Sequence, residues 1–405
     1  MKKQVVIVGA GFAGLRMFYR LQQQKNIEIT LVEPRDASLD RPVLPEVAFA
    51  GKSLHHALVP VRPIVERHGA NYIQRSVEGI DAAKNALLFE NGERLSYDYL
   101  MLAVGAHKDY DAIPGFREYG FSVCDDTEAP RLATAVRAFR GGPVIVGAAK
   151  SVWGNRVVVP NLAAPCEGPI GEIVFMLDRE LRRRGLREAS TITAFSPGAM
   201  FFDDVGPKVH AAIEPMLKTR GIEVVVAKEL AAIERDRVRF VDGSSIESAF
   251  TIVIPPYVGN RAIAASGLGD ERGFIPTDET MRHLDHENIF AAGDGTALSM
   301  PKLGHIAIAQ ADIAAAALVR ALTGNGVVPP YRPEVFCIMN QGGADATLIL
   351  SDTLFGGTRD ITMSGPLAHA MKWAFDSYYF YTRGHMPPDR ANGVLEFFIE
   401  HGLGR

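Results

Sequence analysis

The chain has 405 residues, which is too long for one hydrophobic core and suits two or three domains. Its 47% hydrophobic and 22% charged residues are typical of a soluble globular protein, and the net charge of −4 excludes the basic footprint of a nucleic-acid-binding protein. Three cysteines exclude a disulfide scaffold, and the scattered histidines predict no metal site.

The first predicted elements are a strand, a glycine turn and an amphipathic helix, in "QVVIVGAGFAGLRMFYRLQQQ" (4–24). Gly9, Gly11 and Gly14 form G-x-G-x-x-G, and Glu33 follows at the end of the next predicted strand. These glycines allow a tight turn, a close approach of the backbone to a pyrophosphate and tight helix–strand packing, while the acid binds ribose hydroxyls. The pattern predicts a dinucleotide-binding domain, with the anion at the helix N-terminus.

Two later segments share one layout, which indicates an internal repeat. Residues 87–106 and 238–259 each read as a strand, an Asn-Gly or Asp-Gly hairpin turn, a return strand and a buried strand that ends at small residues or proline. The same hairpin late in two successive α/β blocks predicts two related dinucleotide-type domains.

The second block carries a degraded phosphate loop in "GGPVIVGAAKSVWG" (141–154). The first glycine is Gly147, but Ala149 and Val152 stand at the second and third glycine positions. Side chains there hinder the approach of a pyrophosphate. We therefore expect the fold to persist and nicotinamide binding to be lost.

Cys166 lies in "APCEGPIGEIVFML" (164–177), directly before a predicted helix in which Gly168 and Pro169 suit the cap and first position. A thiolate there is stabilised by the helix N-terminus, so we expect a lowered pKa and a reactive thiol. Glu167 opposes this effect but is a candidate proton shuttle. A buried, inert cysteine is the alternative.

A third motif, "NIFAAGDGTA" (288–297), is an apolar strand that closes on Gly293 and Asp294. In a flavin-binding fold such an aspartate holds the ribityl chain, and the alternative is a plain Asp-Gly turn. The helix predicted in 300–322 begins near His305, and its N-terminus would face the pyrimidine edge of a flavin.

The C-terminal segment 367–384 combines aromatic residues with Lys372 and Arg383 in a partly helical pattern. This pattern suits an interfacial helix with aromatic side chains at the headgroup level, and residues 393–403 extend it. The alternatives are a helix that covers the core and a subunit contact.

Three cysteine contexts carry a family resemblance: "GFSVCDD" (120–126), "APCEGP" (164–169) and "VFCIMN" (335–340). Together with the FAD-type pattern and the Gly-Asp strand, they resemble the sulfide:quinone oxidoreductases among the two-dinucleotide-domain flavoproteins, with the closest likeness to an archaeal-type branch. Further likeness lies in "RPVLPEVA" (41–48), "GFIPTD" (273–278), "PKLGHIA" (301–307) and "FGGT" (355–358).

The resemblance implies FAD and three cysteine roles. Cys337 would lie near the reactive carbon of the flavin ring and form a thiol–flavin adduct, and Cys166 would be its partner across a disulfide or polysulfur bridge on the sulfide side. Cys124 matches a cysteine that in some members is joined covalently to the flavin. Beside the loop glycines and Glu33, the implied FAD-binding residues are Arg41, Val77, Gly105, Gly293, Asp294, Lys302 and Gly304.

The expected fold is α/β, with two Rossmann-like (FAD/NAD(P)-type) domains and a C-terminal membrane-interface region. Residues 1–109 and 263–330 would form the FAD-binding domain, 110–262 the second domain and 331–405 the C-terminal region. The expected function is sulfide oxidation to sulfur or polysulfide with reduction of a membrane quinone. We expect a peripheral, monotopic membrane protein on the cytoplasmic face that forms a homo-oligomer and binds no nucleic acid.

Other functions fit the layout less well. A type II NADH:quinone oxidoreductase would need an intact second phosphate loop and no cysteine pair. A soluble sulfide dehydrogenase that donates electrons to a cytochrome would normally carry an export signal. A non-catalytic redox-sensing flavoprotein would not need the paired cysteine contexts. Because sulfide is partly ionised near neutral pH, the reaction is expected to depend little on a general base.

Overall fold

The strand predicted at the N-terminus forms the centre of a parallel sheet in the computed structural model, which describes residues 2–159 and 162–387. The sheet is built from apolar, β-branched runs buried on both faces, as parallel strands require. Its order is β20-β9-β1-β2-β5: Ile289–Ala291, Tyr99–Leu102, Lys3–Val8, Ile27–Val32 and Asn71–Ile73.

A second sheet repeats this plan, with parallel strands in the order β11-β18-β12-β13-β14. Both predicted hairpins form small antiparallel sheets, β6-β7-β8 and β15-β16-β17, before β9 and β18. The internal repeat is therefore present in three dimensions. The bounds are β11 (Gly120–Phe121), β18 (Phe250–Ile254), β12 (Gly142–Ala148), β13 (Ser190–Phe195), β14 (Ile222–Val225), β6 (Val77–Asp81), β7 (Ala86–Phe89), β8 (Arg94–Ser96), β15 (Leu230–Ile233), β16 (Arg237–Phe240) and β17 (Ser245–Glu247).

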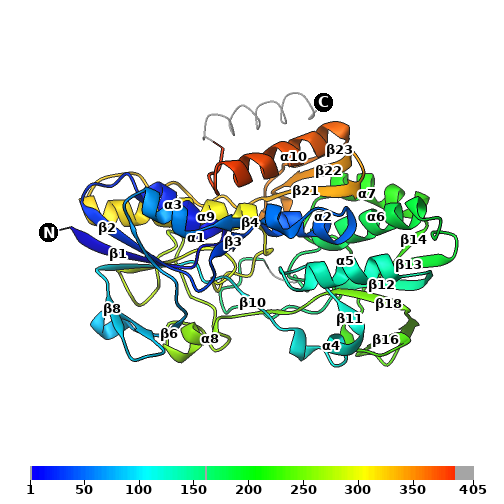
Figure 1. Cartoon of the computed structure of the whole chain (residues 1–405), viewed down its shortest axis with the longest axis horizontal. Helices are drawn as coiled ribbons and strands as arrows, with labels where there is room; N and C mark the ends of the chain where they lie inside the picture. The colour runs from blue at the N-terminus through cyan, green and yellow to red at the C-terminus, as the bar shows by residue number, and fades with distance from the viewer. Residues whose placement is uncertain (1, 160–161, 388–405) are drawn as a thin grey trace.

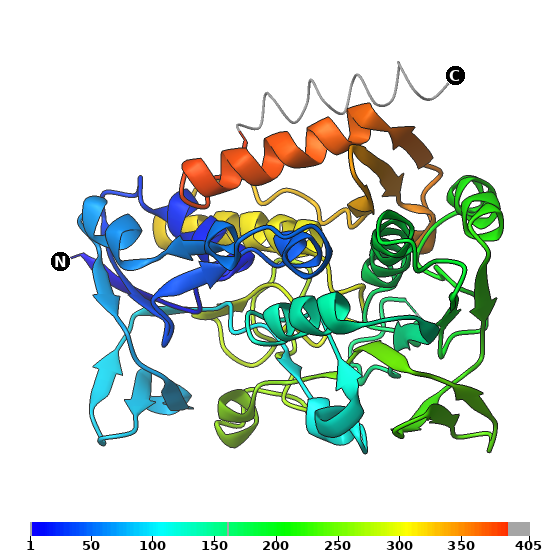
Figure 2. The same cartoon turned by 45° about the vertical axis from the view of Figure 1, so that its right-hand side comes forward.

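Helices cover both sheets, and the two halves lie side by side in Figures 1 and 2. α1 and α9 pack together over the first sheet, and α6 packs on the second sheet and on β21. The two-stranded pairs β3-β4 and β10-β19 complete this part of the fold. The helices are α1 (Phe12–Leu21), α2 (Leu44–Phe49), α3 (Arg62–Arg67), α4 (Phe116–Tyr119), α5 (Glu128–Ala138), α6 (Gly168–Arg183), α7 (Pro207–Thr219), α8 (Arg261–Ala265) and α9 (Gly304–Thr323); the strands are β3 (Ala37–Leu39), β4 (Leu58–Pro60), β10 (His107–Lys108) and β19 (Tyr257–Val258).

The C-terminal region is a three-stranded antiparallel sheet covered by one helix, and it lies above the junction of the two halves (Figure 1). Its elements are β21 (Val335–Gly342), β22 (Asp345–Ser351), β23 (Asp360–Gly365) and α10 (Pro366–Tyr381). The helix predicted in 367–384 is thus confirmed, while residues 393–403 lie outside the described residues. The α/β fold class is confirmed, and the exact domain limits stay a prediction.

Within the described residues, α9 is long and apolar enough to cross a membrane by length and composition alone. Half of its most apolar stretch is buried, and its side chains belong to the core that also contains α1. This burial explains its apolar composition as that of a core helix.

Candidate active site

Cys166 and Cys337 come from distant parts of the chain and meet between α6 and β21. Cys166 lies just before α6, whose cap is Glu167 rather than the expected Gly168, and Cys337 lies within β21. A Cβ added to Gly168 would lie 3.4 Å from Cys337 Sγ and 3.9 Å from Cys166 Sγ. Both thiols are free, without the bond of about 2.05 Å that a disulfide requires.

Both thiols line one small cavity. Its volume of about 10 Å³ leaves room for about one water-sized molecule. The backbone of Phe202 in its wall has a φ of 61°, an unfavourable left-handed conformation for a bulky residue. Strained residues of this kind cluster at functional sites. The cavity is lined by Cys166, Gly168, Phe202, Asp204, Val205, Leu303, Val335, Cys337 and Ile349.

The expected low pKa of Cys166 is wrong, because the structure buries its thiol. Burial raises the pKa of Cys166 well above its ordinary value, and the charges of Asp204 and Cys337 add to this effect. A hydrogen bond from the Gly168 N–H favours the thiolate but does not reverse the shift. Burial followed by the charge of Glu172 raises the pKa of Cys337 to about 12. Both reduced cysteines are therefore neutral thiols near pH 7.

Three carboxyl groups lie beside the cavity. Glu167 Oε2 accepts a hydrogen bond from the Asp203 N–H (3.1 Å), and burial followed by the charge of Asp203 raises the pKa of Glu167 to about 8. Burial and the charge of Asp203 raise the pKa of Asp204 to about 7. Asp204 lines the cavity with both cysteines and was missed from sequence, where its signal is an Asp-Asp pair before a Gly-Pro helix start at Gly206.

The predicted dinucleotide loop has the expected geometry. Gly9 has a φ of 99°, and an added Cβ would lie 2.3 Å from the Ala103 carbonyl oxygen; at Gly14 it would lie 1.9 Å from the Gly9 carbonyl oxygen. At Gly11, the cap of α1, an added Cβ would meet no protein atom within 4 Å. The loop therefore packs tightly on its inner side and is open in front of the helix N-terminus, as a bound pyrophosphate requires.

Glu33 and the remaining implied FAD residues surround this loop. Glu33 Oε2 accepts the Ala10 N–H at 2.8 Å, which fixes the carboxylate against the loop. An added Cβ on Gly304 would touch the Phe12 ring at 3.4 Å, so the N-termini of α9 and α1 converge. Gly105 and Gly293 have φ angles of 64° and 85° in turns beside the loop, and Val77 is half-buried in β6.

A group of buried and half-buried charged side chains also fits the cofactor. Arg41 Nε is buried without a hydrogen-bond partner among the described residues, and its charge acts on Lys108. Burial, with the charge of Arg41, lowers the pKa of Lys108 to about 7, and burial lowers that of Lys302 to about 8. Asp294 opposes both shifts. Lys108 and Lys302 each donate to one backbone carbonyl oxygen and keep further N–H groups, so with the unpaired Arg41 Nε the residues present fit a large polar ligand such as FAD.

Cys124 is buried in a different place from the cavity between Cys166 and Cys337. It lies between β11 and α5, where burial raises its pKa and where hydrogen bonds to Ser122 and Tyr257 favour its thiolate. Its role as a covalent flavin link stays a prediction.

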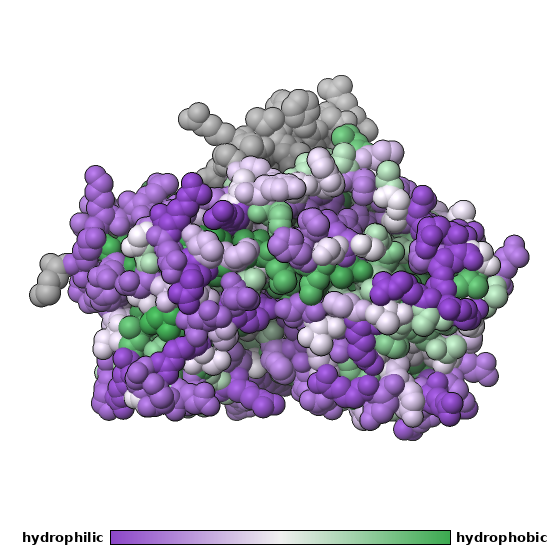
Figure 3. Space-filling view, in the orientation of Figure 1, coloured by the Kyte–Doolittle hydropathy of each residue, from purple (hydrophilic) through white to green (hydrophobic). Residues whose placement is uncertain are grey.

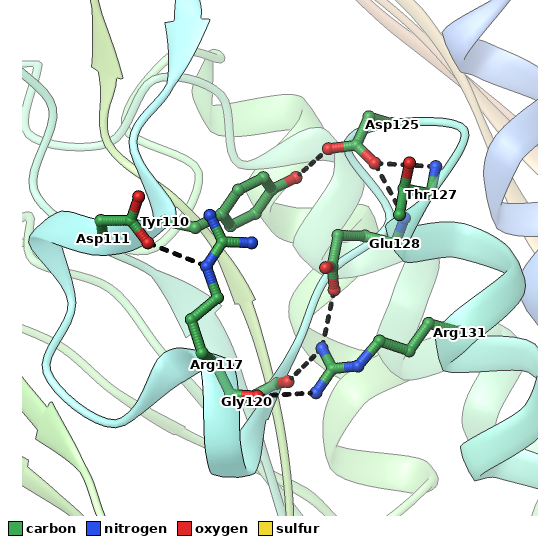
Figure 4. Close-up of polar contacts among 8 residues, drawn as sticks. All are labelled: Tyr110, Asp111, Arg117, Gly120, Asp125, Thr127, Glu128 and Arg131. Carbon is green, nitrogen blue, oxygen red and sulfur yellow. Dashed lines mark hydrogen bonds and ion pairs between the residues drawn. The ribbon is translucent and has the colours of Figure 1, made fainter.

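A polar network holds the turn that follows Cys124 (Figure 4). The Tyr110 hydroxyl donates to Asp125 Oδ2 (2.6 Å), and Asp125 Oδ1 accepts the N–H groups of Thr127 and Glu128 at 2.9 and 2.8 Å. Arg131 then links Glu128 to the Gly120 carbonyl oxygen. The network fixes the start of α5.

The second block has no counterpart of the tight phosphate turn. β12 ends at Ala148, and the described residues between it and α6 form no helix. An added Cβ on Gly147 would lie 2.3 Å from the Phe195 ring, and one on Gly154 would lie 2.4 Å from Ala297 Cα. The chain here packs against Phe195 and Ala297, which leaves no open loop for a phosphate. The N-terminus of α6 is instead preceded by Cys166.

Comparison with known families agrees with this geometry. The model of the pyridine nucleotide-disulphide oxidoreductases matches residues 3–155 and 179–311. The chain belongs to this family. FAD as cofactor is thereby confirmed, while the covalent bond through Cys124 is not tested.

Two relatives of this pyridine nucleotide-disulphide oxidoreductase are named for sulfide and quinone. The sulfide-quinone reductase of Aquifex aeolicus is 26% identical over 99% of this chain and 96% of its own length. The mitochondrial sulfide:quinone oxidoreductase of Dictyostelium discoideum is 25% identical over 87% and 78%. The crystal structure of the Aquifex aeolicus enzyme has a TM-score of 0.88 at 24% identity, covering 98% of this chain and 96% of its own. These relatives give no support to the narrower expectation of an archaeal-type branch.

Proposed function

We propose that this oxidoreductase passes electrons from sulfide to a quinone. The observation that carries the proposal is the cysteine pair of Cys166 and Cys337, which face one small cavity at Gly168 in a fold that also has an FAD loop. A cavity of this size suits a substrate as small as hydrogen sulfide. The names of the two relatives support the same pair of substrates.

The two cysteines have different roles in this proposal. In the oxidised pair, HS⁻ attacks Cys166 Sγ, a new sulfur–sulfur bond forms, and the bond to Cys337 breaks with its electron pair going to Cys337. Cys166 then carries a persulfide, and Cys337 is a thiolate on the side of β21. The chemistry that FAD supplies when bound is two-electron transfer from sulfur to the quinone.

The NADH-dependent alternative lacks a matching site. It would need an open phosphate loop at a helix N-terminus in the second block, where Ala149 stands at the second glycine position and the described residues between β12 and α6 form no helix. With purified protein and a soluble quinone analogue, we expect quinone reduction with sulfide and none with NADH. Reduction by NADH alone would overturn the proposal, and turnover with neither donor would favour the redox-sensing alternative.

We also propose that α10 holds the protein at a membrane, where the quinone resides. Its inner side chains Ala368, Lys372, Asp376 and Tyr379 are buried, whereas Leu367, Trp373 and Tyr381 are 63%, 64% and 78% exposed. Exposed aromatic and apolar side chains on one side of a helix suit the lipid headgroup level. In Figure 3 hydrophobic residues form a broken band across the middle of this face, below α10, and the lower edge of the molecule is mainly hydrophilic.

Phe336 and Tyr379 are candidate quinone neighbours beneath this helix. Phe336 packs into the cluster that includes Ala368 of α10, and the Tyr379 ring lies 5.0 Å from that of Phe12 at the start of α1. Tyr379 thus faces the FAD-binding side from α10, and Phe336 of β21 packs beside His305 of α9. The cytoplasmic face and the homo-oligomer stay predictions.

Filling the cavity should slow the reaction with sulfide without unfolding the protein. In Gly168→Ala, the new methyl group would make ordinary contacts with both sulfurs and occupy the space between them. We expect kcat/KM for sulfide to fall about tenfold or more, because a group displaced by about 1 Å can cost about a hundredfold. Gly168 is the first residue of α6 and its backbone is not in the left-handed region, so alanine fits there and the Tm should not fall.

The matched control for this variant is Gly79→Ala in β6, where an added Cβ also makes only ordinary contacts at 3.6 and 3.7 Å. It should leave kcat/KM for sulfide unchanged. An unchanged kcat/KM in Gly168→Ala would show that sulfide does not react between the two sulfurs.

A further inference from the structure

Asp204 is the one acidic side chain that lines the cavity between Cys166 and Cys337 within the described residues. It is 4% exposed, and its Oδ1 atom has no hydrogen-bond partner there. A buried carboxyl oxygen with no partner has an unused capacity to accept a proton or a hydrogen bond, and native structures rarely leave such a group without a reason. The other lining residues besides the cysteines and Gly168 are apolar: Phe202, Val205, Leu303, Val335 and Ile349.

These walls favour a neutral molecule over an anion. A cation could compensate a buried HS⁻, but no lysine, arginine or histidine lines the cavity within the described part of the chain. Lys372 acts on Cys337 from outside, and its Nζ already binds Asp376 Oδ2 (3.1 Å) and the Pro42 carbonyl oxygen (2.9 Å). The Gly168 N–H at the N-terminus of α6 already binds Cys166, so an anion beside Asp204 would lose its hydration and meet a like charge.

We propose that the cavity admits neutral H₂S and that Asp204 is the base that deprotonates it there. This inference rests on the proposed function and identifies the form of sulfide that enters; it departs from the expectation of little need for a general base, because the apolar walls disfavour the ionised form. One S–H bond breaks, its proton goes to the Asp204 carboxylate and its electron pair stays on sulfur. The resulting HS⁻ then bonds to Cys166 Sγ while the bond from Cys166 to Cys337 breaks, so that no further oxidant is needed in this step.

The neighbours of Asp204 provide an exit for the proton. Asp203, the adjacent residue, is half-buried and closer to solvent, and burial raises the pKa of its carboxyl only to about 6. Its N–H also binds Glu167, which precedes α6. The charge of Asp203 acts on Asp204, and the charge of Asp204 acts in turn on Glu167, Cys166 and, in β21, Cys337; these are the charged or titratable groups that face it.

The pH dependence of flavin reduction follows from the protonation states of Asp204 and of sulfide. Burial raises the pKa of Asp204 to about 7, so below this pH it is increasingly protonated and cannot accept a proton. At high pH the carboxylate is available, but H₂S gives way to HS⁻. The rate of flavin reduction at limiting total sulfide should therefore pass through a maximum near neutral pH in the unaltered protein.

The deciding experiment measures flavin reduction by sulfide in the FAD-loaded protein without quinone, from about pH 6 to pH 9. In Asp204→Asn only preformed HS⁻ can react, so we expect a loss of about a hundredfold at the acid end and a rise with pH to within a few-fold of the unaltered protein. The maximum should disappear. A uniform loss at every pH, or an unchanged profile, would overturn the role of Asp204.

Asp203→Asn is the matched control, since Asp203 acts on Asp204 by charge but does not line the cavity. It should keep the maximum and move the acid side of the profile to lower pH, because the raised pKa of Asp204 depends partly on Asp203. The same profile in both variants would overturn the proposal in favour of a general electrostatic effect. If sulfide fails to reduce the flavin of the unaltered protein at any pH, the proposed function itself fails.

Discussion

Serine in place of Cys337 or Cys166 is expected to abolish flavin reduction by sulfide while FAD stays bound. Each sulfur is one end of the bridge that sulfide opens, and a hydroxyl group can form no such bridge. We expect a loss of more than about a thousandfold, as for other enzymes that lose a covalent nucleophile. Stopped-flow absorbance of the flavin at limiting sulfide measures the rate.

The fold should tolerate both changes. A serine hydroxyl at Cys166 can accept the hydrogen bond that the Gly168 N–H gives to the thiol. Cys124→Ser is the matched control, because this cysteine is buried outside the cavity; once loaded with FAD, this variant should keep the reaction with sulfide. Retained turnover in Cys166→Ser or Cys337→Ser would contradict the two-thiol scheme. The mass of the denatured, unaltered chain separately decides whether Cys124 holds the flavin covalently.

Gly11→Val is expected to remove FAD without unfolding the protein. The added side chain starts in open space, since its Cβ meets no protein atom within 4 Å and the backbone has an ordinary φ of −70°. That open space lies at the N-terminus of α1, where the pyrophosphate must approach the backbone. We expect colourless protein, a loss of at least about a hundredfold in FAD affinity, and a far-UV circular dichroism spectrum like that of the unaltered apoprotein.

Gly11→Ala is the graded control for this substitution. Its single methyl group should weaken FAD binding less than valine does, which fluorescence titration of the apoproteins with FAD can measure. Full FAD occupancy in Gly11→Val would contradict the assignment of the phosphate site to this loop. If Gly11→Val misfolds, the space in front of the N-terminus of α1 is not open as the structure indicates.

Local patterns were enough to predict much of the fold. The strand, glycine turn and helix around Gly9 and Gly14 depend on neighbouring residues and on steric limits of the backbone, and they form as expected. The two hairpins also form, because the turn residues and the alternation of side chains act within about 20 residues. The degraded second loop agrees with the lack of a helix between β12 and α6 among the described residues, and the helix predicted directly after Cys166 forms as α6.

The candidate site was predicted only in part. The cysteine contexts singled out Cys166 and Cys337, and the fold brings their side chains to Gly168. The expected low pKa of Cys166 failed because the helix N-terminus is a local effect, whereas burial sums over every element packed around the sulfur. The only sequence signal of Asp204 is an Asp-Asp pair before a helix start, which names no chemistry, since the importance of Asp204 lies in facing a cavity whose other walls come from four separate parts of the chain.

The sequence by itself determined the two dinucleotide-type blocks, the FAD loop and the set of cysteines, because these depend on short-range spacing and backbone sterics. Only the tertiary structure decided which of those cysteines meet, how deeply they are buried and that Asp204 joins them. Desolvation and cavity shape are properties of packed surfaces, and residues as distant as Cys166, Asp204 and Cys337 acquire them together only when the chain is folded.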